Sequence, residues 1–452
     1  MPNPVPPRCR RESFGRTGRG DSRGEPAENQ RRAQAKCGLG ACRLSPGLAF
    51  CLALRPRMKP PSERFLLLLL AAVQFTHIMD FMIMMPLGQQ LMREWDVGPG
   101  QFSRLVSVYT LVAGIAGLLM APFVDRHDRR TMVLVAYAGF AGGTLACALS
   151  HSPGALLLAR GVCGLFGGIA GTAVMSIVGN IVPAARRGAA MGTIMTAFSA
   201  AAALGVPFGL YLAQRFTWES PFFLLAGLAL ANWILLWRFL PPVRGHLDGD
   251  ATPGFGRFLA LLRNRNAGWG LLFMATLVFG HFSLIPLLAP HLVGNLGLPE
   301  KHLSLVYLVG GVLSAITGPR IGRLADAVGK VRVFSFLVCV ACAVTLAIAL
   351  SPPLPMGVIL ALGGGYFVFG SGRFVPGQAI LSLAVNRHDR GAYMSLSGCV
   401  RDLAGGLSSM LGGLIVAKTA DGHLQHFDRL GWIAVASAIL TLWMVRRIQP
   451  VE

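Results

Sequence analysis

The sequence predicts an all-α membrane protein with twelve transmembrane helices in two pseudo-symmetric six-helix bundles. Hydrophobic residues make up 53% of the chain and charged residues only 13%, about half of the roughly 25% that is usual in soluble domains. The hydrophobic residues gather in runs of about twenty, each long enough to cross a bilayer core of ~30 Å as a helix. Landmarks in the first half of the chain also recur in the second half.

The apolar runs lack the period-two alternation of barrel strands, so we expect helices. Glycine is abundant, with 56 residues, as in membrane helices that approach one another closely. We expect twelve spans, at residues 65–92, 103–122, 131–150, 154–182, 189–213, 220–240, 267–291, 303–320, 333–351, 356–384, 391–417 and 429–446.

Three landmarks repeat along the chain with offsets of 201, 203 and 204 residues. Because the three offsets are nearly equal, we infer that residues 65–240 and 267–447 are two copies of one hydrophobic unit, as in many secondary transporters. The matched landmarks are Asp125-Arg126-His127-Asp128-Arg129-Arg130 with Gly322–Arg332, Arg187–Met191 with Arg390–Met394, and His77 and Pro86 with His281 and Pro290.

The net charge of +21 raises the possibility of a nucleic-acid partner, but its placement indicates topology instead. Of the 29 Lys and Arg after residue 57, 20 fall on the side shared by both termini and the loops after even-numbered spans, against 6 on the other side. By the positive-inside rule we expect that side to be cytoplasmic, with no nucleic-acid partner. The loops concerned are 123–130, 183–188, 241–266, 319–332 and 385–390.

The chain divides by composition into four regions. Residues 1–57, rich in Arg, Pro and Gly, are predicted to be a disordered basic extension that is not translated if synthesis starts at Met58. The alternative is a targeting segment, because Arg10-Arg11 and the apolar Gly47–Leu54 faintly resemble an export signal. The remaining regions are an N-terminal bundle at 58–240, a cytoplasmic central loop at 241–266 and a C-terminal bundle at 267–452.

The cysteines do not predict a cofactor or a metal site. Of the nine, four lie in the N-terminal extension and five within spans. Cys339 and Cys342 form a C-x-x-C in the middle of an apolar run without a second pair or a histidine nearby, so we expect packing.

The twelve spans, the six-plus-six division and the duplicated loop together resemble the major facilitator superfamily, from about residue 62 to the end. The signature loop of that family follows the pattern G-x-x-x-D-R-x-G-R-K/R. The second copy here has Gly322, Asp326, Gly329 and Lys330 in place.

The first copy of the loop keeps Asp125, Arg126, Arg129 and Arg130 but has Asp128 where the family prefers glycine. Because that glycine permits a tight turn, we expect a different turn here. The family also prefers glycine at the position of Ala121.

In the family the loop carboxylates latch the cytoplasmic side shut. A carboxylate is stabilised at the exposed amides that begin a facing helix. By pseudo-symmetry Asp125 would face the span that starts at Gly391, and Asp326 the span that starts at Gly188. The alternative, that the loop charges only anchor to lipid headgroups, explains the arginines but not the matched aspartates.

Two further motifs carry the resemblance. Arg160-Gly161-Val162-Cys163-Gly164 fits the family pattern R-x-x-x-G, in which the arginine takes part in proton coupling; alternatively Arg160 extends to the outer headgroups. Gly205, Pro207 and Gly209 resemble the exporter motif, although Val206 interrupts its Gly-Pro order.

Stretches in the first and tenth spans resemble the drug:proton antiporter and sugar-efflux branch of the family. In the first span the resemblance covers His77–Gly88. In the tenth it covers Ser371–Pro376 and is weaker.

Only two carboxylates lie inside the predicted spans, Asp80 and Asp402. A charge near the bilayer centre is costly, so such residues usually face a cavity and have a function. A desolvated carboxylate binds a proton more readily than an exposed one. We therefore expect Asp80 to carry a coupling proton with His77, one turn earlier; the alternative is a static pair of Asp80 with His77.

The second bundle is expected to hold the substrate surface. Adjacent residues of a helix point in different directions, so Arg401 and Asp402 are not expected to pair, and Arg373 is a candidate partner for Asp402. His281 is the counterpart of His77, with Leu284 where Asp80 would be. The aromatic candidates for the cavity are Phe279, Phe282, Tyr307, Tyr366 and Phe369.

These features predict a proton-coupled antiporter that exports small amphipathic molecules or drugs, working as a monomer in a bacterial-type cytoplasmic (inner) membrane. Its expected partners are the small-molecule substrate, protons and the lipid bilayer. The alternatives are a sugar or metabolite efflux permease, or a membrane sensor without transport. No enzyme activity is expected, because the longest internal loop lacks a nucleophile, a metal motif or a paired-acid cluster.

Deleting residues 1–57 should change neither membrane insertion nor activity, because the first span is apolar enough to insert without help. Immunoblots of the membrane fraction and a transport assay would check both. Loss of either would show that the extension has a function.

Overall fold

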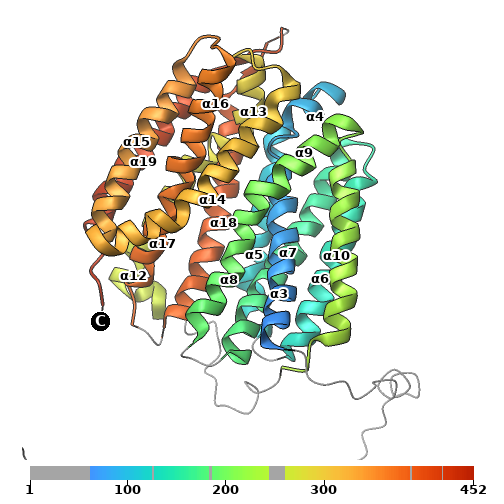
Figure 1. Ribbon diagram of the computed structural model, residues 1–452, viewed down its shortest axis with the longest axis vertical. Helices are drawn as coiled ribbons and strands as arrows, with labels where there is room; N and C mark the ends of the chain where they lie inside the picture. Colours follow the sequence, from blue (N-terminus) through green and yellow to red (C-terminus); the bar gives the residue numbers. More distant parts are fainter. Residues whose placement is uncertain are drawn as a thin grey trace, which may run out of the picture. The chain divides into compact units, whose positions relative to one another are not determined.

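A computed structural model describes residues 62–124, 127–182, 186–243, 260–386, 389–419 and 421–451. These residues belong to one compact unit whose helices run roughly parallel to one axis (Figure 1). Ten helical segments of the described part are long and apolar enough to cross a membrane. They confirm the predicted all-α membrane fold.

The first half, residues 62–243, contains the helices that Figure 1 colours from blue to green. They are α3 (Glu63–Ile83), α4 (Gly88–Glu94), α5 (Pro99–Val124), α6 (Arg129–Ala148), α7 (Pro153–Ile181), α8 (Arg187–Ala200), the π-helix η2 (Ala201–Gly205), α9 (Val206–Arg215) and α10 (Ser220–Phe239).

The second half, residues 260–451, is coloured from yellow to red and lies beside the first (Figure 1). A two-residue hairpin, β1 (Ala417–Lys418) antiparallel to β2 (Leu424–Gln425), precedes its last helix. The helices are α12 (Arg265–Phe282), α13 (Ile285–Gly294), the 3₁₀-helix η3 (Glu300–His302), α14 (Leu303–Val328), α15 (Lys330–Leu350), α16 (Met356–Gly365), the π-helix η4 (Tyr366–Ser371), α17 (Phe374–Ser382), α18 (Arg390–Ile415) and α19 (Phe427–Val445).

The predicted spans 189–213 and 391–417 are not among the ten apolar segments. Helices occupy both: α8, η2 and α9 cover the first, and α18 covers the second. α18 carries Arg401 and Asp402, and the other span is divided by its π-helix. The number of twelve transmembrane helices therefore stays a prediction.

Side-chain caps start several of the helices. The Ser62 and Ser152 hydroxyls accept from amides in the first turns of α3 and α7, at 3.3 and 3.2 Å. Asn264 accepts from two amides of α12. Such caps satisfy donors that a helix start leaves without partners.

The two signature loops turn differently, as the sequence predicted. Gly329 separates α14 from α15 with φ = 112°, a conformation that residues with a Cβ rarely adopt. Asp128, in the first copy, has φ = −57° and caps α6 by accepting from the Arg130 amide at 3.0 Å. It also accepts from the Val243 amide at 3.1 Å. A side-chain cap thus replaces the glycine turn.

The two halves meet where α5 packs along α18 and where α14 packs on η2. Small residues make the first contact close: an added Cβ on Gly413 would lie 2.3 Å from Ser103 Cβ, and one on Gly114 would lie 3.0 Å from the Cys399 carbonyl. On α14, an added Cβ at Gly311 would lie 2.5 Å from the Ala202 carbonyl of η2. Close backbone approach of this kind is how membrane helices associate.

The two ends of the molecule pack differently. The end with α4 and α13 is called the outer end, after the predicted topology, and the end with the His127–Asp128 and Gly329 connections is called the loop end. One hydrophobic core contains the apolar residues of the first half together with outer-end residues of the second, among them Leu287 and Leu292 of α13. The loop-end part of the second half has two further cores, around Phe273 and around Ile321, and Leu118 of α5 packs against the first of them. The halves therefore share a core at the outer end.

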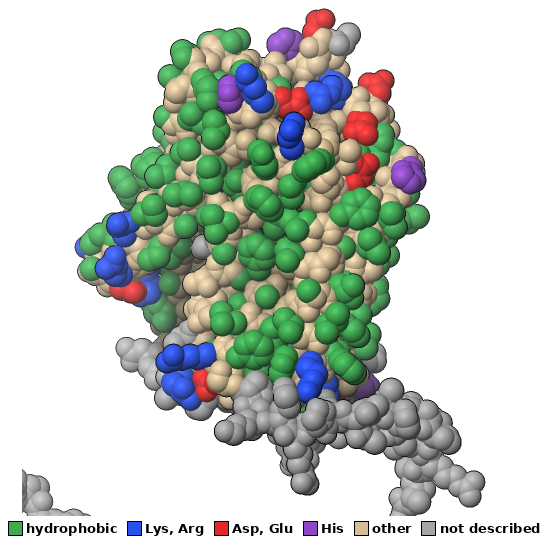
Figure 2. Space-filling view, turned by 45° about the vertical axis from the view of Figure 1, so that its right-hand side comes forward, with side chains coloured by type: hydrophobic (Ala, Val, Ile, Leu, Met, Phe, Trp, Pro, Cys, Tyr) green, Lys and Arg blue, Asp and Glu red, His purple; other side chains and the backbone are tan. Residues whose placement is uncertain are grey.

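The surface matches a membrane environment. In Figure 2 hydrophobic side chains cover the middle of the visible face, and charged side chains gather toward its two ends. Many large apolar residues are more than half exposed, for example Leu158 at 74% and Leu119 at 63%. A lipid-facing surface accounts for this exposure.

The repeated loops should lie on one side of the membrane. His127 and Ala327 are both exposed at the loop end. Single-cysteine variants His127→Cys and Ala327→Cys, made in a background without the native cysteines, should react with an impermeant maleimide from the same side of sealed vesicles. Labelling from opposite sides would contradict the duplication.

Candidate functional site

A fully buried ion pair lies inside the first half. Arg160 Nη1 of α7 lies 2.7 Å from Asp80 Oδ2 of α3, and both side chains have 0% exposure. The same nitrogen donates to the Asp80 carbonyl at 3.2 Å. Thr144 of α6 donates its hydroxyl to Asp80 Oδ1 at 3.3 Å. Side chains of two helices, α6 and α7, therefore hold one carboxylate of α3.

The pair depends on close packing of α7 against α5. An added Cβ at Gly164, the glycine of the R-x-x-x-G motif, would lie 2.3 Å from the Tyr109 carbonyl, and one at Gly168 would lie 2.5 Å from the Ala113 carbonyl. The Arg160 guanidinium carbon stands 4.3 Å from the centre of the Tyr109 ring, a cation–π contact. The glycines bring α7 close enough for Arg160 to cover Tyr109 and reach Asp80.

Of the two alternatives for Arg160, the structure shows a buried side chain and not one that extends to the headgroups. The partner of Asp80 is Arg160 and not His77. His77 lies beside Tyr109 and Phe140, with ring centroids 5.8 and 5.9 Å away. Its two ring nitrogens are buried and make no hydrogen bond among the described residues.

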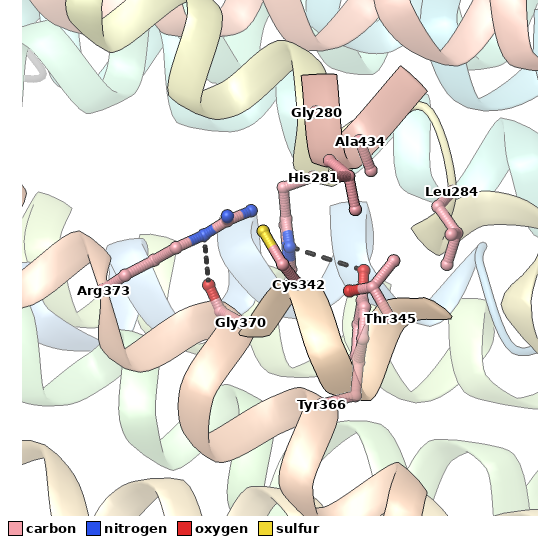
Figure 3. A pocket seen from close by; sticks show the side chains of 10 residues that line it. Gly280, His281, Leu284, Cys342, Thr345, Tyr366, Gly370, Arg373 and Ala434 are labelled. Atoms are coloured by element: carbon pink, nitrogen blue, oxygen red, sulfur yellow. Dashed lines mark hydrogen bonds between the residues drawn. The ribbon is translucent and has the colours of Figure 1, made fainter. Parts of the chain in front are cut away.

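A second polar cluster lies in the second half and lines a small pocket (Figure 3). His281 of α12 stacks on Tyr366 at 5.4 Å, and the Tyr366 hydroxyl lies 3.4 Å from His281 Nδ1. Arg373 donates its Nε to the Gly370 carbonyl at 3.1 Å. Leu284, the repeat counterpart of Asp80, also lines this pocket.

Stacked aromatic rings connect the two clusters across the interface between the halves. Phe81 of α3 stacks on Tyr109 at 5.5 Å and on Phe282 of α12 at 5.8 Å. Phe282 in turn contacts the His281 ring at 5.7 Å. Phe81 therefore places α3 in direct ring contact with α12.

The prediction that Arg401 and Asp402 do not pair was wrong. Arg401 Nε lies 3.0 Å from Asp402 Oδ1, because the long arginine side chain curls back to its neighbour although the two Cβ directions differ. Arg373 is consequently not the partner of Asp402. The side chain of Arg401 is 46% exposed although it lies in the middle of α18.

The predicted latch residues are placed only in part. Asp125 and Arg126 lie outside the described residues. Arg129 and Arg130 donate to the carbonyls of Ser176 in α7 and Trp237 in α10, at 3.0 and 2.7 Å. Both carbonyls lie near helix C-termini, where the dipole favours a positive charge.

In the second copy, the Asp326 side chain is 75% exposed and lies 3.2 Å from Lys330 Nζ. It does not occupy the expected position at the start of α8. The pair that it forms is with Lys330, one turn later in the same loop region. The roles of Gly322, Asp326, Gly329 and Lys330 as a latch stay predictions.

The exporter-like motif lies where α9 packs on α3. Added Cβ atoms at Gly205 and Gly209 would lie 2.8 Å from Met79 Sδ and 2.7 Å from Ile83 Cδ1. Pro207 stands in the first turn of α9, directly after the π-helix η2, where its missing N–H is tolerated. The motif therefore brings this helix against the helix that carries Asp80.

Sequence reasoning missed the polar contacts that close the outer end. Arg93 of α4 pairs with Glu300 of η3 at 2.5 Å, Gln214 donates to the Glu300 carbonyl at 2.7 Å, and Lys418 to the Met92 carbonyl at 3.3 Å. Each contact joins the two halves. Isolated charges in loops carry no sequence signal for a partner about 200 residues away.

A metal or cofactor site is not evident in the part of the chain that the structure describes. Within these residues no group of three or more His, Cys, Asp and Glu is arranged to hold a metal ion.

The buried pair should affect stability far more than the exposed pair Arg93–Glu300. Arg160→Gln leaves the Asp80 carboxylate buried without a counter-ion, which costs about 3–5 kcal/mol. Arg93→Gln, the matched control, should cost at most about 1 kcal/mol. Thermal unfolding of the detergent-solubilised protein would compare the variants, and adding Asp80→Asn to Arg160→Gln should restore part of the loss. Equal melting temperatures for the two single variants would contradict the structural importance of the pair.

Comparison with known proteins agrees with this fold. A model of the Major Facilitator Superfamily matches residues 70–409. The uncharacterized MFS-type transporter YbcL of Bacillus subtilis (strain 168) is 22% identical over 349 residues, which cover 77% of this chain and 87% of the relative. The multidrug resistance protein MdtG of Serratia proteamaculans (strain 568) is 24% identical over 367 residues, which cover 80% and 86% of the two chains.

Among solved structures, the D-xylose-proton symporter has a TM-score of 0.68 at 16% sequence identity, covering 86% of this chain and 98% of that chain. At this identity the likeness shows the fold alone. The family model, in contrast, extends over most of the described helices. The chain therefore belongs to the Major Facilitator Superfamily and is a multi-pass membrane transporter of that family.

Proposed function

We propose that this transporter is a proton-driven exporter of small amphipathic molecules that works by alternating access. The observation that carries the proposal is the Asp80–Arg160 pair, with both side chains fully buried inside the first half. Burying a charged pair in the middle of a bilayer costs free energy, so residues of this kind usually have a function. Asp80 is the group that would bind the coupling proton and become neutral.

Protonation of Asp80 changes what Arg160 binds. The charged carboxylate holds Arg160 at 2.7 Å and links α3 to α7. A neutral carboxyl group attracts the guanidinium much less, and Arg160 keeps its place over the Tyr109 ring. Loading a proton therefore loosens the contact between α3 and α7, and releasing it restores the contact.

The aromatic contacts supply a route from this event to the second half. α3 carries both Asp80 and Phe81, and Phe81 stacks on Phe282 of α12. Movement of α3 therefore acts directly on the second half. The glycine-lined contact between α5 and α18 provides a surface about which the halves can tilt.

In this conformation the outer end is closed by Arg93–Glu300 and by the shared hydrophobic core. Alternation would break these contacts and bring the loop ends together, where Asp326 would engage the start of α8. If the loop end is cytoplasmic, as the charge bias predicts, the conformation opens inward, the state that takes up a substrate for export.

Two observations support export of drug-like molecules. The motif at Gly205, Pro207 and Gly209 resembles that of exporters and packs against the helix that carries Asp80. The relative from Serratia proteamaculans is named a multidrug resistance protein. Sugar or metabolite efflux is the second candidate, because the fold resembles a D-xylose-proton symporter. The relatives from bacteria favour the cytoplasmic (inner) membrane, and we propose a monomer.

Cells that express the full chain should accumulate less of at least one compound from a panel of fluorescent drugs and labelled sugars. A proton uncoupler should abolish the difference, because the gradient supplies the energy. Asp80→Asn removes the proton carrier and should raise accumulation to the level of cells without the protein.

Asp96→Asn is the matched control. Asp96 is exposed on the outer side with φ = 46°, a conformation that asparagine also tolerates. This variant should transport normally. The exporter hypothesis fails if no compound shows an uncoupler-sensitive difference, and unaltered pumping by Asp80→Asn would exclude Asp80 as the carrier.

A further inference from the structure

The second half contains a buried arginine, Arg373, whose pocket has no acidic side chain. Arg373 is 6% exposed, and its one hydrogen bond among the described residues runs from Nε to the Gly370 carbonyl. The ten residues that line the pocket around it include no Asp or Glu. Arginine stays protonated inside proteins, so this positive charge persists.

In the first half the equivalent position carries an acidic residue. There Arg160 is neutralised by Asp80, which follows His77 by three residues. In the repeat His281 corresponds to His77, and position 284, which would carry the acid, is leucine. Leu284 is 1% exposed and lines the pocket that holds Arg373. The replacement of an acid by leucine leaves the charge of this pocket uncompensated.

The shape of the cluster fits a planar anion. Figure 3 shows the Arg373 guanidinium extending toward His281 and Cys342, with its two terminal nitrogens turned away from the Gly370 carbonyl that binds Nε. Two parallel N–H groups of a guanidinium match the two oxygens of a carboxylate. The Tyr366 and Thr345 hydroxyls line the same pocket and add donors.

The surroundings of the cluster are aromatic. The rings of Phe282 and Phe374 lie 5.7 and 5.4 Å from that of His281, and Phe81 of the first half stacks on Phe282. The enclosed space is about the size of one water molecule, so the side chains around Arg373 would move apart to admit a carboxylate, and a whole amphipathic molecule would not fit there. An apolar body attached to that group would lie against these rings.

One helical stretch, which includes the π-helix η4, supplies three residues of the pocket. Tyr366 begins η4, Gly370 lies within it, and Arg373 comes two residues after its end. Their spacing of four and three residues places all three on one face of the helix. Such π-helical turns are frequent at functional sites.

We propose that the pocket formed by Arg373, His281 and Tyr366 binds the carboxylate of an amphipathic, preferably aromatic, organic acid as the transported substrate. The proposal rests on the exporter function above and specifies its substrate class. The first half would then handle the proton and the second half the anionic end of the substrate. Because the anion binds in the absence of any gradient, a binding measurement separates this proposal from the transport proposal.

Equilibrium dialysis of the purified full chain in detergent, with 2-naphthoate and its uncharged methyl ester as probes, would test the proposal. The wild-type protein should bind the acid roughly tenfold or more tightly than the ester, because only the acid forms a charge-assisted bidentate contact. Equal affinity for the two probes, or no binding of the acid, would overturn the proposal. This comparison requires no variant.

Arg373→Gln should weaken naphthoate binding by roughly tenfold or more and leave ester binding unchanged, which also reports that the variant is folded. Arg320→Gln, the matched control, removes an exposed arginine of α14 and should leave both affinities unchanged. An Arg373→Gln protein that binds naphthoate as the wild type does would contradict the assignment.

Leu284→Asp offers a second and independent variant. It introduces into this pocket the acid that the first half contains, so the new carboxylate should neutralise Arg373 and weaken naphthoate binding while ester binding persists. Unchanged naphthoate binding would count against the site. Displacement of naphthoate by millimolar chloride would identify a halide site and also overturn the proposal.

Discussion

The burial of a carboxylate beside a guanidinium inside the first half is the constraint on which the rest of this structure depends. Charges of this kind are stable away from water only when geometry and hydrogen bonds compensate for lost hydration. Asp80 obtains that compensation from Arg160 at 2.7 Å and from Thr144 at 3.3 Å. The glycines of α7, which let it approach the backbone of α5, are therefore part of the electrostatic site although they carry no charge.

The repeat has produced two halves with one scaffold and different chemistry. Both contain a histidine at the equivalent point of their first span and a buried arginine, but only the first half contains the acid. The first half is thus internally neutral at this site, whereas the second half holds an uncompensated positive charge. In the proposed mechanism a proton would change the charge of the first site and an anionic ligand would neutralise the second, so the two proposals are complementary. The stack of Tyr109, Phe81 and Phe282 joins them.

The packing differs between the centre of the molecule and its two ends. Contacts between α5 and α18 are backbone-close, because glycines stand where side chains would collide. The outer end adds a shared hydrophobic core and an exposed ion pair, which alone contributes at most about 1 kcal/mol. At the loop end the second half has its own cores, and Asp326 is mostly exposed. The proposed alternation would open one end while the central contact persists.

The sequence by itself determined the fold class and the approximate placement of the helices, because long apolar runs and a 200-residue repeat are local or periodic signals. It also singled out Asp80, Arg160, His281 and Arg373, since charge inside an apolar run is visible without coordinates. Only the tertiary structure decided their partners. Which helix faces which depends on packing between segments distant in sequence, so the pairing of Asp80 with Arg160, the isolation of Arg373 and the curled Arg401–Asp402 contact could not be read from spacing.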